Sequence, residues 1–339
     1  MADGNVKQRF VYRREYVDAP YEWNRSEFTE GQWDVEEYAK HVSMEVIEMS
    51  DDSVEFDIRN LHPSFVNALR RILIAEVPTV AIEKVHLFQN TSVIADEVLA
   101  HRLGLIPLAV NPKKLSWVEP GKELNEQNSL LFRLNVRCKL EAKSGSKKEK
   151  QVVNSKVYSK DLSWVPLNGQ DDVFKGKPPR PAVPDILIAK LALSDELECD
   201  CYCVKGIGRD HAKFSPVCAC FFRFHPEIVL RRDFYDEEAE LLKAHMSKGV
   251  IDCIPCEGGR KKAVVSNARL ETFCGNHFRI PELAEAVMVT SKMDHVIFTV
   301  ESVGQMKAAK AVAEAFEVMV AKCDKLLKAL DFANSEMPT

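Results

Sequence analysis

The clearest periodic pattern in the chain lies in residues 60–85. Pro63 suits the first turn of a helix, and the apolar side chains after it recur at spacings of three and four, which predicts an amphipathic helix. Pro78 ends that helix, and residues 79–85 alternate apolar and polar side chains with β-branched enrichment, which predicts a strand. The apolar positions of the helix are Phe65, Val66, Leu69, Ile72 and Leu73.

Alternation predicts further elements on both sides of this unit. Two apolar alternations in residues 42–58, separated by a polar turn, predict a hairpin. Residues 86–224 hold short alternating runs and many turn residues, which indicates a β-rich region with exposed loops. From residue 225 onward longer patterns return, and they end in a strand over residues 296–302 and a long helix after Gly304.

The two ends of the chain differ from this pattern. Residues 1–40 mix aromatic with charged side chains and show no sustained period. Disordered segments are poor in aromatic residues, so we predict an arm that packs on another surface. Residues 334–339 are expected to form a short tail after the last helix.

The last predicted helix carries an apolar seam with heptad spacing. Such a stripe requires a covering surface, and the pattern alone allows either the chain's own sheet or a second chain. Several neighbouring apolar side chains widen the stripe on one side. The seam consists of Met306, Ala309, Ala313, Phe316, Val320, Cys323, Leu327 and Leu330.

Composition narrows the class of protein. The chain has 339 residues, of which 46% are hydrophobic, and this length favours two domains. Its net charge of −5 provides no global basic field for phosphates, so direct sequence-specific DNA binding is not expected. No apolar run is long enough to cross a membrane, and the N-terminus lacks a signal-peptide core. We therefore expect a soluble intracellular chain whose ten cysteines are reduced.

Clustered cysteines raise the possibility of a metal site. They lie in residues 199–203, 218–220 and 253–256. Alternate thiols on one strand are about 7 Å apart along the backbone, whereas tetrahedral zinc holds each sulfur about 2.3 Å from one point. Only Cys253 and Cys256 have the spacing of a zinc half-site, and no second half lies near them. Reduced, buried thiols are the favoured interpretation, and a free-standing thiol or metal protein is the alternative.

A glycine motif in residues 204–217 is the other candidate for chemistry. Gly206 and Gly208 lack the third glycine and the helix start of a dinucleotide-binding fingerprint. His211 lies beside Asp210 and close to Lys213, yet no nucleophile or second carboxylate accompanies them in a recognisable motif. We expect no catalytic residue and no cofactor here.

Three stretches together resemble one family. Residues 60–85 and 100–108 resemble the signature of the α and α-like subunits of DNA-directed RNA polymerases. Residues 204–217 are similar to the Lys-Gly-Ile-x-x-x-His-Ala-Lys-x-Ser-Pro motif of the eukaryotic and archaeal members. The resemblance extends over about residues 40–333 and implies an α+β fold. It implies a discontinuous dimerisation domain of antiparallel sheet and amphipathic helices, residues 41–85 and 225–333, with a β-rich domain inserted at residues 86–224.

The resemblance implies assembly and no chemistry of the chain's own. A small α-like subunit would form a heterodimer with the chain, and the pair would seat the second-largest and largest polymerase subunits beside small zinc-binding ones. No DNA-reading C-terminal domain like that of bacterial α is expected, and nuclear location, including the nucleolus, is implied. The cysteine cluster that the RNA polymerase II relative carries after the Gly-Leu-Ile-Pro segment is missing from residues 109–136. The resemblance is therefore to the subunit shared by polymerases I and III, which make rRNA, 5S rRNA and tRNA, and the polymerase II subunit is the alternative.

The resemblance also assigns residues to contacts. Arg70 and Arg71, about 100° apart on the signature helix, would dock a large subunit, and at least one of them must face outward. The interface with the small partner would comprise Phe65, Leu69, Ile72, Leu73, Phe316, Val320, Cys323, Leu327 and Leu330. Assembly contacts of the inserted domain would comprise His101, Arg102, Lys205, His211, Lys213 and Phe214.

Overall fold

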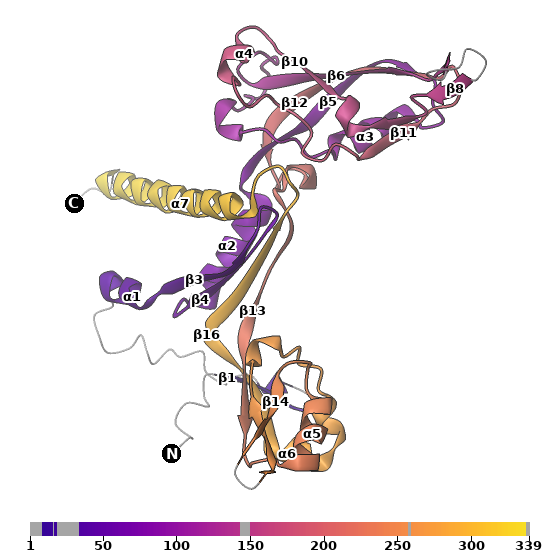
Figure 1. Ribbon diagram of the computed structural model, residues 1–339. Helices are drawn as coiled ribbons and strands as arrows, with labels where there is room; N and C mark the ends of the chain where they lie inside the picture. Colours follow the sequence, from indigo (N-terminus) through magenta and orange to yellow (C-terminus); the bar gives the residue numbers. More distant parts are fainter. Residues whose placement is uncertain (1–8, 16, 19–33, 143–149, 257–258, 337–339) are drawn as a thin grey trace. The chain divides into compact units, whose positions relative to one another are not determined.

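The computed structural model describes residues 9–336 except 16, 19–33, 143–149 and 257–258 (Figure 1). Antiparallel sheets and helices form a mixed α+β fold, which confirms the predicted fold class. Among the described residues, none of the helices combines the length and apolar character needed to span a bilayer.

The chain forms two compact units. The first comprises Met1–Ile47, Glu55–Val66 and Phe221–Phe298, and the second comprises Glu48–Val54, Asn67–Cys220 and Thr299–Thr339. These units do not coincide with the predicted domains, because the last helix belongs to the same unit as the inserted β-rich region. Units defined by the density of contacts need not have the same boundaries as domains. The discontinuous dimerisation domain therefore stays a prediction.

A six-stranded sheet supports the first unit. Its order is β2-β1-β16-β4-β3, and β13 pairs with β16 as well. Phe56 and Phe298 stack within it, with ring centroids 5.1 Å apart. The elements of this unit, some of which continue into the other, are β1 (Arg9–Tyr12), β2 (Val17–Asp18), α1 (Val35–His41), β3 (Ser43–Met49), β4 (Ser53–Arg59), β13 (Val217–Leu230), α5 (Asp236–His245), β14 (Ile251–Pro255), β15 (Lys261–Val265), α6 (Pro281–Ala286) and β16 (Val287–Ser302).

A four-stranded sheet of order β10-β6-β12-β5 supports the second unit. One face carries the buried cysteines of β12 and apolar side chains of β6, and Leu99 and Leu103 of α3 join the same core cluster. The elements are α2 (Pro63–Ala75), β5 (Pro78–Asn90), α3 (Asp96–Gly104), β6 (Ser129–Arg137), β7 (Lys139–Ala142), β8 (Lys150–Val153), β9 (Lys156–Tyr158), β10 (Ser163–Val165), α4 (Gln170–Val173), β11 (Leu187–Lys190), β12 (Glu196–Ile207) and α7 (Ala308–Glu336), with short 3-10 turns η3 (Pro112–Lys114) and η5 (Ala212–Phe214).

Part of the N-terminal arm joins the first sheet. β1 pairs antiparallel with β16, and Tyr12 stacks on Phe273 with ring centroids 4.1 Å apart. β1 therefore packs on its own chain, whereas α1 buries none of its residues. The aromatic residues Tyr16, Tyr21, Trp23, Phe28 and Trp33 lie outside the described residues.

An ionic network lies inside the first unit. Arg269 donates to Asp57 at 2.8 Å and to Glu55 at 2.7 Å, and His295 Nε2 lies 2.7 Å from Asp57. Burial alone would raise the pKa of Asp57, but hydrogen bonds from His295 and Arg269 hold it below its usual value. The network keeps a buried carboxylate charged because its partners are fixed around it.

His225 makes this unit sensitive to acid. Its ring stacks on His295 with centroids 4.4 Å apart, and its Nδ1 is buried without a partner in the described residues. Burial, followed by the charge of His295, lowers the pKa of His225 from 6.5 to about 4. As the pH falls, the unfolded chain therefore protonates His225 at a higher pH than the folded chain does. The stability that is present above pH 6.5 is lost as the pH falls toward 4.

We expect His225→Phe to reduce this loss, since phenylalanine keeps the stacking and does not titrate. The measurement is the urea midpoint of unfolding at pH 7 and pH 5. Some loss will persist, because burial also lowers the pKa of His277. Protonation of Asp57 belongs to a lower range, below its ordinary value of 3.8. Equal losses in the variant and the natural chain would contradict the assignment.

Candidate subunit interface

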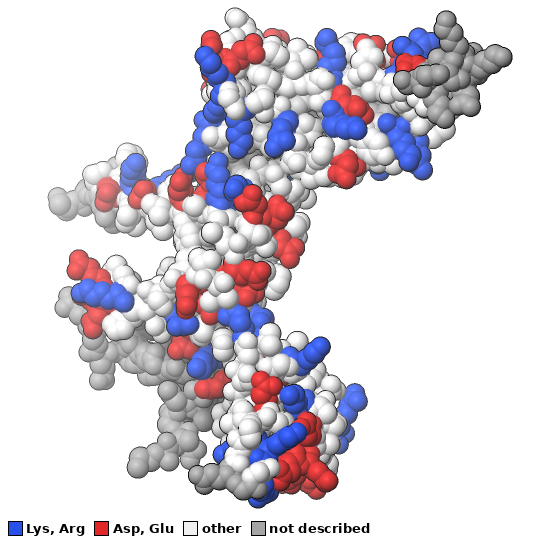
Figure 2. Space-filling view, viewed as in Figure 1, with Lys and Arg blue, Asp and Glu red and all other residues white. Residues whose placement is uncertain are grey.

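The second half of α7 is an uncovered apolar surface. Ala308, Ala311, Val312 and Ala315 in its first turns are buried, whereas every described side chain in residues 320–333 is exposed. Figure 2 shows mainly uncharged atoms with a few scattered charges on the face of α7 turned toward the viewer. The exposed fractions are 60% for Val320, 66% for Leu326, 59% for both Leu327 and Leu330, and 64% for Phe332. Exposed apolar side chains of this size along one helix are typical of a surface that another chain covers, and the partner interface stays a prediction.

The structure divides the predicted partner interface into two groups. Phe65, Phe316, Val320, Cys323, Leu327 and Leu330 are exposed. Leu69, Ile72 and Leu73 have exposed fractions of 1%, 4% and 0%, because the apolar stripe of α2 packs into the chain's own core. These three side chains have almost no surface to offer a partner in this conformation.

Ion pairs fix α7 within its unit. Lys322 Nζ donates to both carboxylate oxygens of Glu76, just after α2, at 2.7 and 2.8 Å. Lys113 of η3 pairs with Glu314 at 3.0 Å and with Glu317 at 2.7 Å. Exposed pairs of this kind contribute at most about 1 kcal/mol each, so they orient α7 and stabilise it little.

The arginine pair on α2 has one outward member. Arg70 is half-buried, and its Nε donates to Asn67 Oδ1 at 3.0 Å. Arg71 is exposed, and within the described ranges it makes no ion pair or side-chain hydrogen bond. Ile74, three residues further along α2, is also exposed, at 37%. Arg71 is therefore the member whose guanidinium is free to meet another chain.

The glycines of residues 204–217 have a packing role that the sequence did not indicate. A Cβ at Gly206 would lie 2.6 Å from the Phe214 ring, and one at Gly208 would lie 2.1 Å from the carbonyl oxygen of Ile74. Arg209 N donates to Ala75 O at 2.8 Å, so the loop is bound to the end of α2. Gly206 thus makes room for the Phe214 ring, and Gly208 permits the close approach of two backbones.

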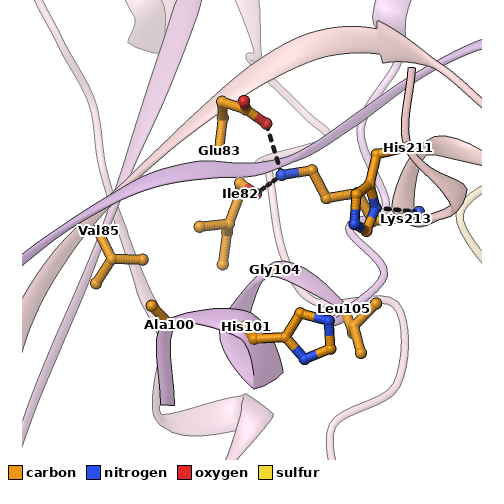
Figure 3. A pocket seen from close by; sticks show the side chains of 9 residues that line it. All are labelled: Ile82, Glu83, Val85, Ala100, His101, Gly104, Leu105, His211 and Lys213. Carbon is orange, nitrogen blue, oxygen red and sulfur yellow. Dashed lines mark hydrogen bonds and ion pairs between the residues drawn. The ribbon is translucent and has the colours of Figure 1, made fainter. Parts of the chain in front are cut away.

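His211 and Lys213 of the same motif line a pocket together with residues of α3, among them His101. Figure 3 shows His101, His211 and Lys213 around it, with Glu83 beside Lys213. Lys213 Nζ donates to Glu83 Oε2 at 2.5 Å and to Ile82 O at 2.8 Å. His211 Nδ1 accepts a hydrogen bond from Lys213 N at 3.1 Å. Residues distant in sequence therefore line one pocket, and their assignment to assembly contacts stays a prediction.

The other three predicted assembly residues make contacts within the chain. Arg102 donates to the carbonyl oxygens of Ile188 and Leu187 at 3.1 and 2.7 Å. Lys205 Nζ lies 4.8 Å from the centroid of the Trp117 ring, and burial lowers the pKa of Lys205. Phe214 is 4% exposed and packs under Gly206.

Of the seven clustered cysteines, three lie in the core, Cys218 is exposed, and Cys220, Cys253 and Cys256 are half-buried, so the expectation of buried thiols is correct only for β12. Cys199, Cys201 and Cys203 are fully buried, and the sulfurs of Cys199 and Cys201 are 3.8 Å apart. Burial raises the pKa of Cys203 far above its ordinary value, so its thiol stays protonated. No group of three or more His, Cys, Asp or Glu side chains in the described part of the chain is arranged to hold a metal ion.

Comparison with known proteins identifies the family of the chain. The family model of the RNA polymerase Rpb3/Rpb11 dimerisation domain matches residues 55–323. The DNA-directed RNA polymerases I and III subunit RPAC1 of Mus musculus is 43% identical over 303 residues, which cover 88% of this chain and 87% of the relative.

More distant relatives give the same family. RPAC1 of Saccharomyces cerevisiae is 37% identical over 308 residues, covering 89% of this chain and 91% of the relative. The DNA-directed RNA polymerase II subunit rpb3 of Dictyostelium discoideum is 30% identical over 312 residues, covering 85% of this chain and 94% of the relative. Identity is thus higher to the polymerase I and III subunits than to this polymerase II subunit. The chain belongs to the family of α-like RNA polymerase subunits that share the Rpb3/Rpb11 dimerisation domain.

Proposed function

We propose that this chain is the non-catalytic assembly subunit common to RNA polymerases I and III. The observation that carries the proposal is the apolar second half of α7, which residues of this chain leave exposed. Relatives covering most of the chain are named as subunits of these two polymerases. The protein would act in the nucleus, including the nucleolus, in the synthesis of rRNA, 5S rRNA and tRNA.

The exposed surface of α7 would bind a small α-like subunit. Val320, Leu327 and Leu330 follow one another at spacings of seven and three, so a partner helix can pack along them as in a coiled coil. Phe65 and Phe316 would extend this contact, while Leu69 and Leu73 support α2 from inside. The dimerisation domain would combine residues 41–85 and 225–333, with residues 86–224 inserted.

Co-expression tests the heterodimer. The chain alone is expected to aggregate, because an exposed apolar helix face associates non-specifically. Co-expression with the small α-like subunit should give a soluble 1:1 complex, observed by size-exclusion chromatography with light scattering. A stable, soluble monomer without affinity for that subunit would contradict the proposal.

Arg71 would dock the second-largest polymerase subunit, with small zinc-binding subunits bound nearby. We expect Arg71→Glu to reduce recovery of that subunit about tenfold, since reversing a charge in a contact costs more than 1.4 kcal/mol. Arg70→Glu should have a smaller effect, because Arg70 is held by Asn67.

The measurement is quantitative mass spectrometry of subunits purified with the tagged chain. Lys190→Glu, an exposed lysine on β11, is the matched control. Loss of the small α-like subunit from the Arg71→Glu variant would show that the two contacts are not separate.

A further inference from the structure

Helix α7 turns two different faces to its surroundings. Ala308, Ala311 and Ala315 are buried in the chain, and their spacings of three and four residues place them on one face. Leu327 of the exposed seam lies about 120° around the helix from Ala315, at 100° per residue. The seam therefore faces away from the chain only at one rotation of α7 about its own axis.

One ion pair holds the exposed half of α7. Ala315 is the last buried apolar side chain of the helix among the described residues. Of the described side chains in residues 320–333, only that of Lys322 forms a hydrogen bond or an ion pair with another described element, through both carboxylate oxygens of Glu76 at 2.7 and 2.8 Å. Lys322 lies about 20° from Ala315 around the helix, so the pair continues the buried face.

A second ion pair holds the other side of the helix. Glu314 pairs with Lys113 of η3 at 3.0 Å, and its side chain is 13% exposed. Glu314 and Lys322 each lie about 140° from Leu327 around the helix, in opposite directions. The paired charges therefore flank the side of α7 opposite to Leu327, and two contacts on different sides of the axis oppose rotation of the helix.

Such pairs can affect binding more than they affect the stability of the fold. A helix that is free to rotate or tilt must be ordered when a partner binds, and this ordering lowers the affinity. The contacts of Glu314 and Lys322 order α7 before a partner arrives. Their loss should therefore weaken the binding of a partner along the seam while the buried first turns of α7 keep the fold.

We propose that Lys322 and Glu76 position α7 for the binding of the small α-like subunit. Lys113 and Glu314 hold the other side of the helix. This inference rests on the proposed function. The four charged residues do not contact the partner, and they keep the rotation of α7 at which the apolar seam faces it.

Competition for the small α-like subunit tests the inference. The natural chain and a variant carry different tags and are co-expressed with a limiting amount of that subunit. Mass spectrometry of the purified small subunit then gives the share of each chain bound to it, relative to the total amount of that chain. We expect Lys322→Glu to lower this share about fivefold, since it places two carboxylates together. Lys322→Glu combined with Glu76→Lys, which restores the pair, should return within about twofold of the natural chain.

Lys325→Glu is the matched control, because Lys325 is exposed on the same helix and forms no ion pair with the described residues. Its share should stay within about twofold of that of the natural chain. An unchanged share for Lys322→Glu, an equal loss for Lys325→Glu, or no recovery in the charge-swapped variant would overturn the positioning role. A natural chain that does not bind the small subunit even without a competitor is instead a failure of the proposed function.

The effect of salt distinguishes an ion pair from a purely structural role. Labelled small subunit is exchanged into purified heterodimer at about 0.05 M and about 0.5 M salt, where the screening of exposed charges differs strongly. We expect salt to accelerate exchange in the natural heterodimer. The neutral variant Lys322→Met with Glu76→Gln should exchange faster at low salt and respond less to added salt. An equal response to salt in both heterodimers would overturn the inference.

Discussion

Replacement of Leu327 by aspartate is expected to abolish pairing with the small α-like subunit while the chain keeps its fold. Leu327 is 59% exposed in the half of α7 that the described residues leave uncovered. A charge there costs nothing in the isolated chain. In an apolar interface it costs several kcal/mol, which corresponds to a loss of affinity of about a thousandfold. Co-purification of the two tagged subunits measures the effect.

Two further variants show whether the effect belongs to this surface. Lys325→Asp introduces the same residue about 200° around α7 from Leu327 and should leave pairing intact. Leu69→Asp should instead unfold the chain, because Leu69 is 1% exposed and an unpaired buried charge is not tolerated. Retention of the partner by the Leu327 variant would exclude the second half of α7 from the interface.

Gly208→Ala is expected to destabilise the protein by about 3 kcal/mol, the sum of forced overpacking and a lost hydrogen bond. The added Cβ would lie 2.1 Å from the Ile74 carbonyl oxygen, a backbone atom that can move only with the end of α2. The hydrogen bond from Arg209 N to Ala75 O would then be broken. The shift of the urea midpoint of the co-expressed heterodimer measures the loss.

Gly104→Ala is the matched control for this change. A Cβ at Gly104 meets its nearest atom, the Ile82 carbonyl oxygen, at 3.5 Å, which is ordinary van der Waals contact. Gly104 is the last residue of α3 and has no positive φ, so its backbone conformation accepts alanine. Equal midpoint shifts for the two alanine variants would show that the contact with Ile74 is not what requires glycine at position 208.

Periodicity predicted the elements that carry a strong local signal. α2 was predicted from its spacing and its flanking prolines, and β3 and β4 from alternation around a polar turn. β5 and β16 are longer than predicted, because pairing extends them through residues without a clear alternation. β5 continues to Asn90, which pairs with Leu197, and β16 begins at Val287, where burial occurs on both faces of the strand.

The sequence pattern did not show which of the predicted interface residues are exposed to a partner. The apolar stripes of α2 and α7 have the same spacing, yet Leu69 is buried and Leu327 is exposed. A stripe indicates that a side chain requires cover and does not indicate which chain provides it. The alternation of Cys199, Cys201 and Cys203 correctly placed three thiols on one face, and that face is buried in one core cluster with Leu99 and Leu103 of α3.

The close approach at Gly206 and Gly208 depends on contacts with residues distant in sequence. Phe214 and Ile74 come from different elements, so no local pattern predicts the distance between them. No local pattern predicts the pocket near His101 either, because α3 and residues 211–213 meet only in the folded chain. The resemblance assigned residues of both elements to assembly contacts. In the folded chain Arg102 and Phe214 make contacts within the chain, whereas the His101 side chain is exposed.

The most direct measurement is the identity of the polymerases that contain this chain. The endogenous chain would be tagged and purified at moderate salt, and the bound large subunits identified by mass spectrometry. We predict recovery of the largest subunits of RNA polymerases I and III without that of RNA polymerase II. Recovery of the polymerase II subunit instead, or of no polymerase subunit, would contradict the proposed function.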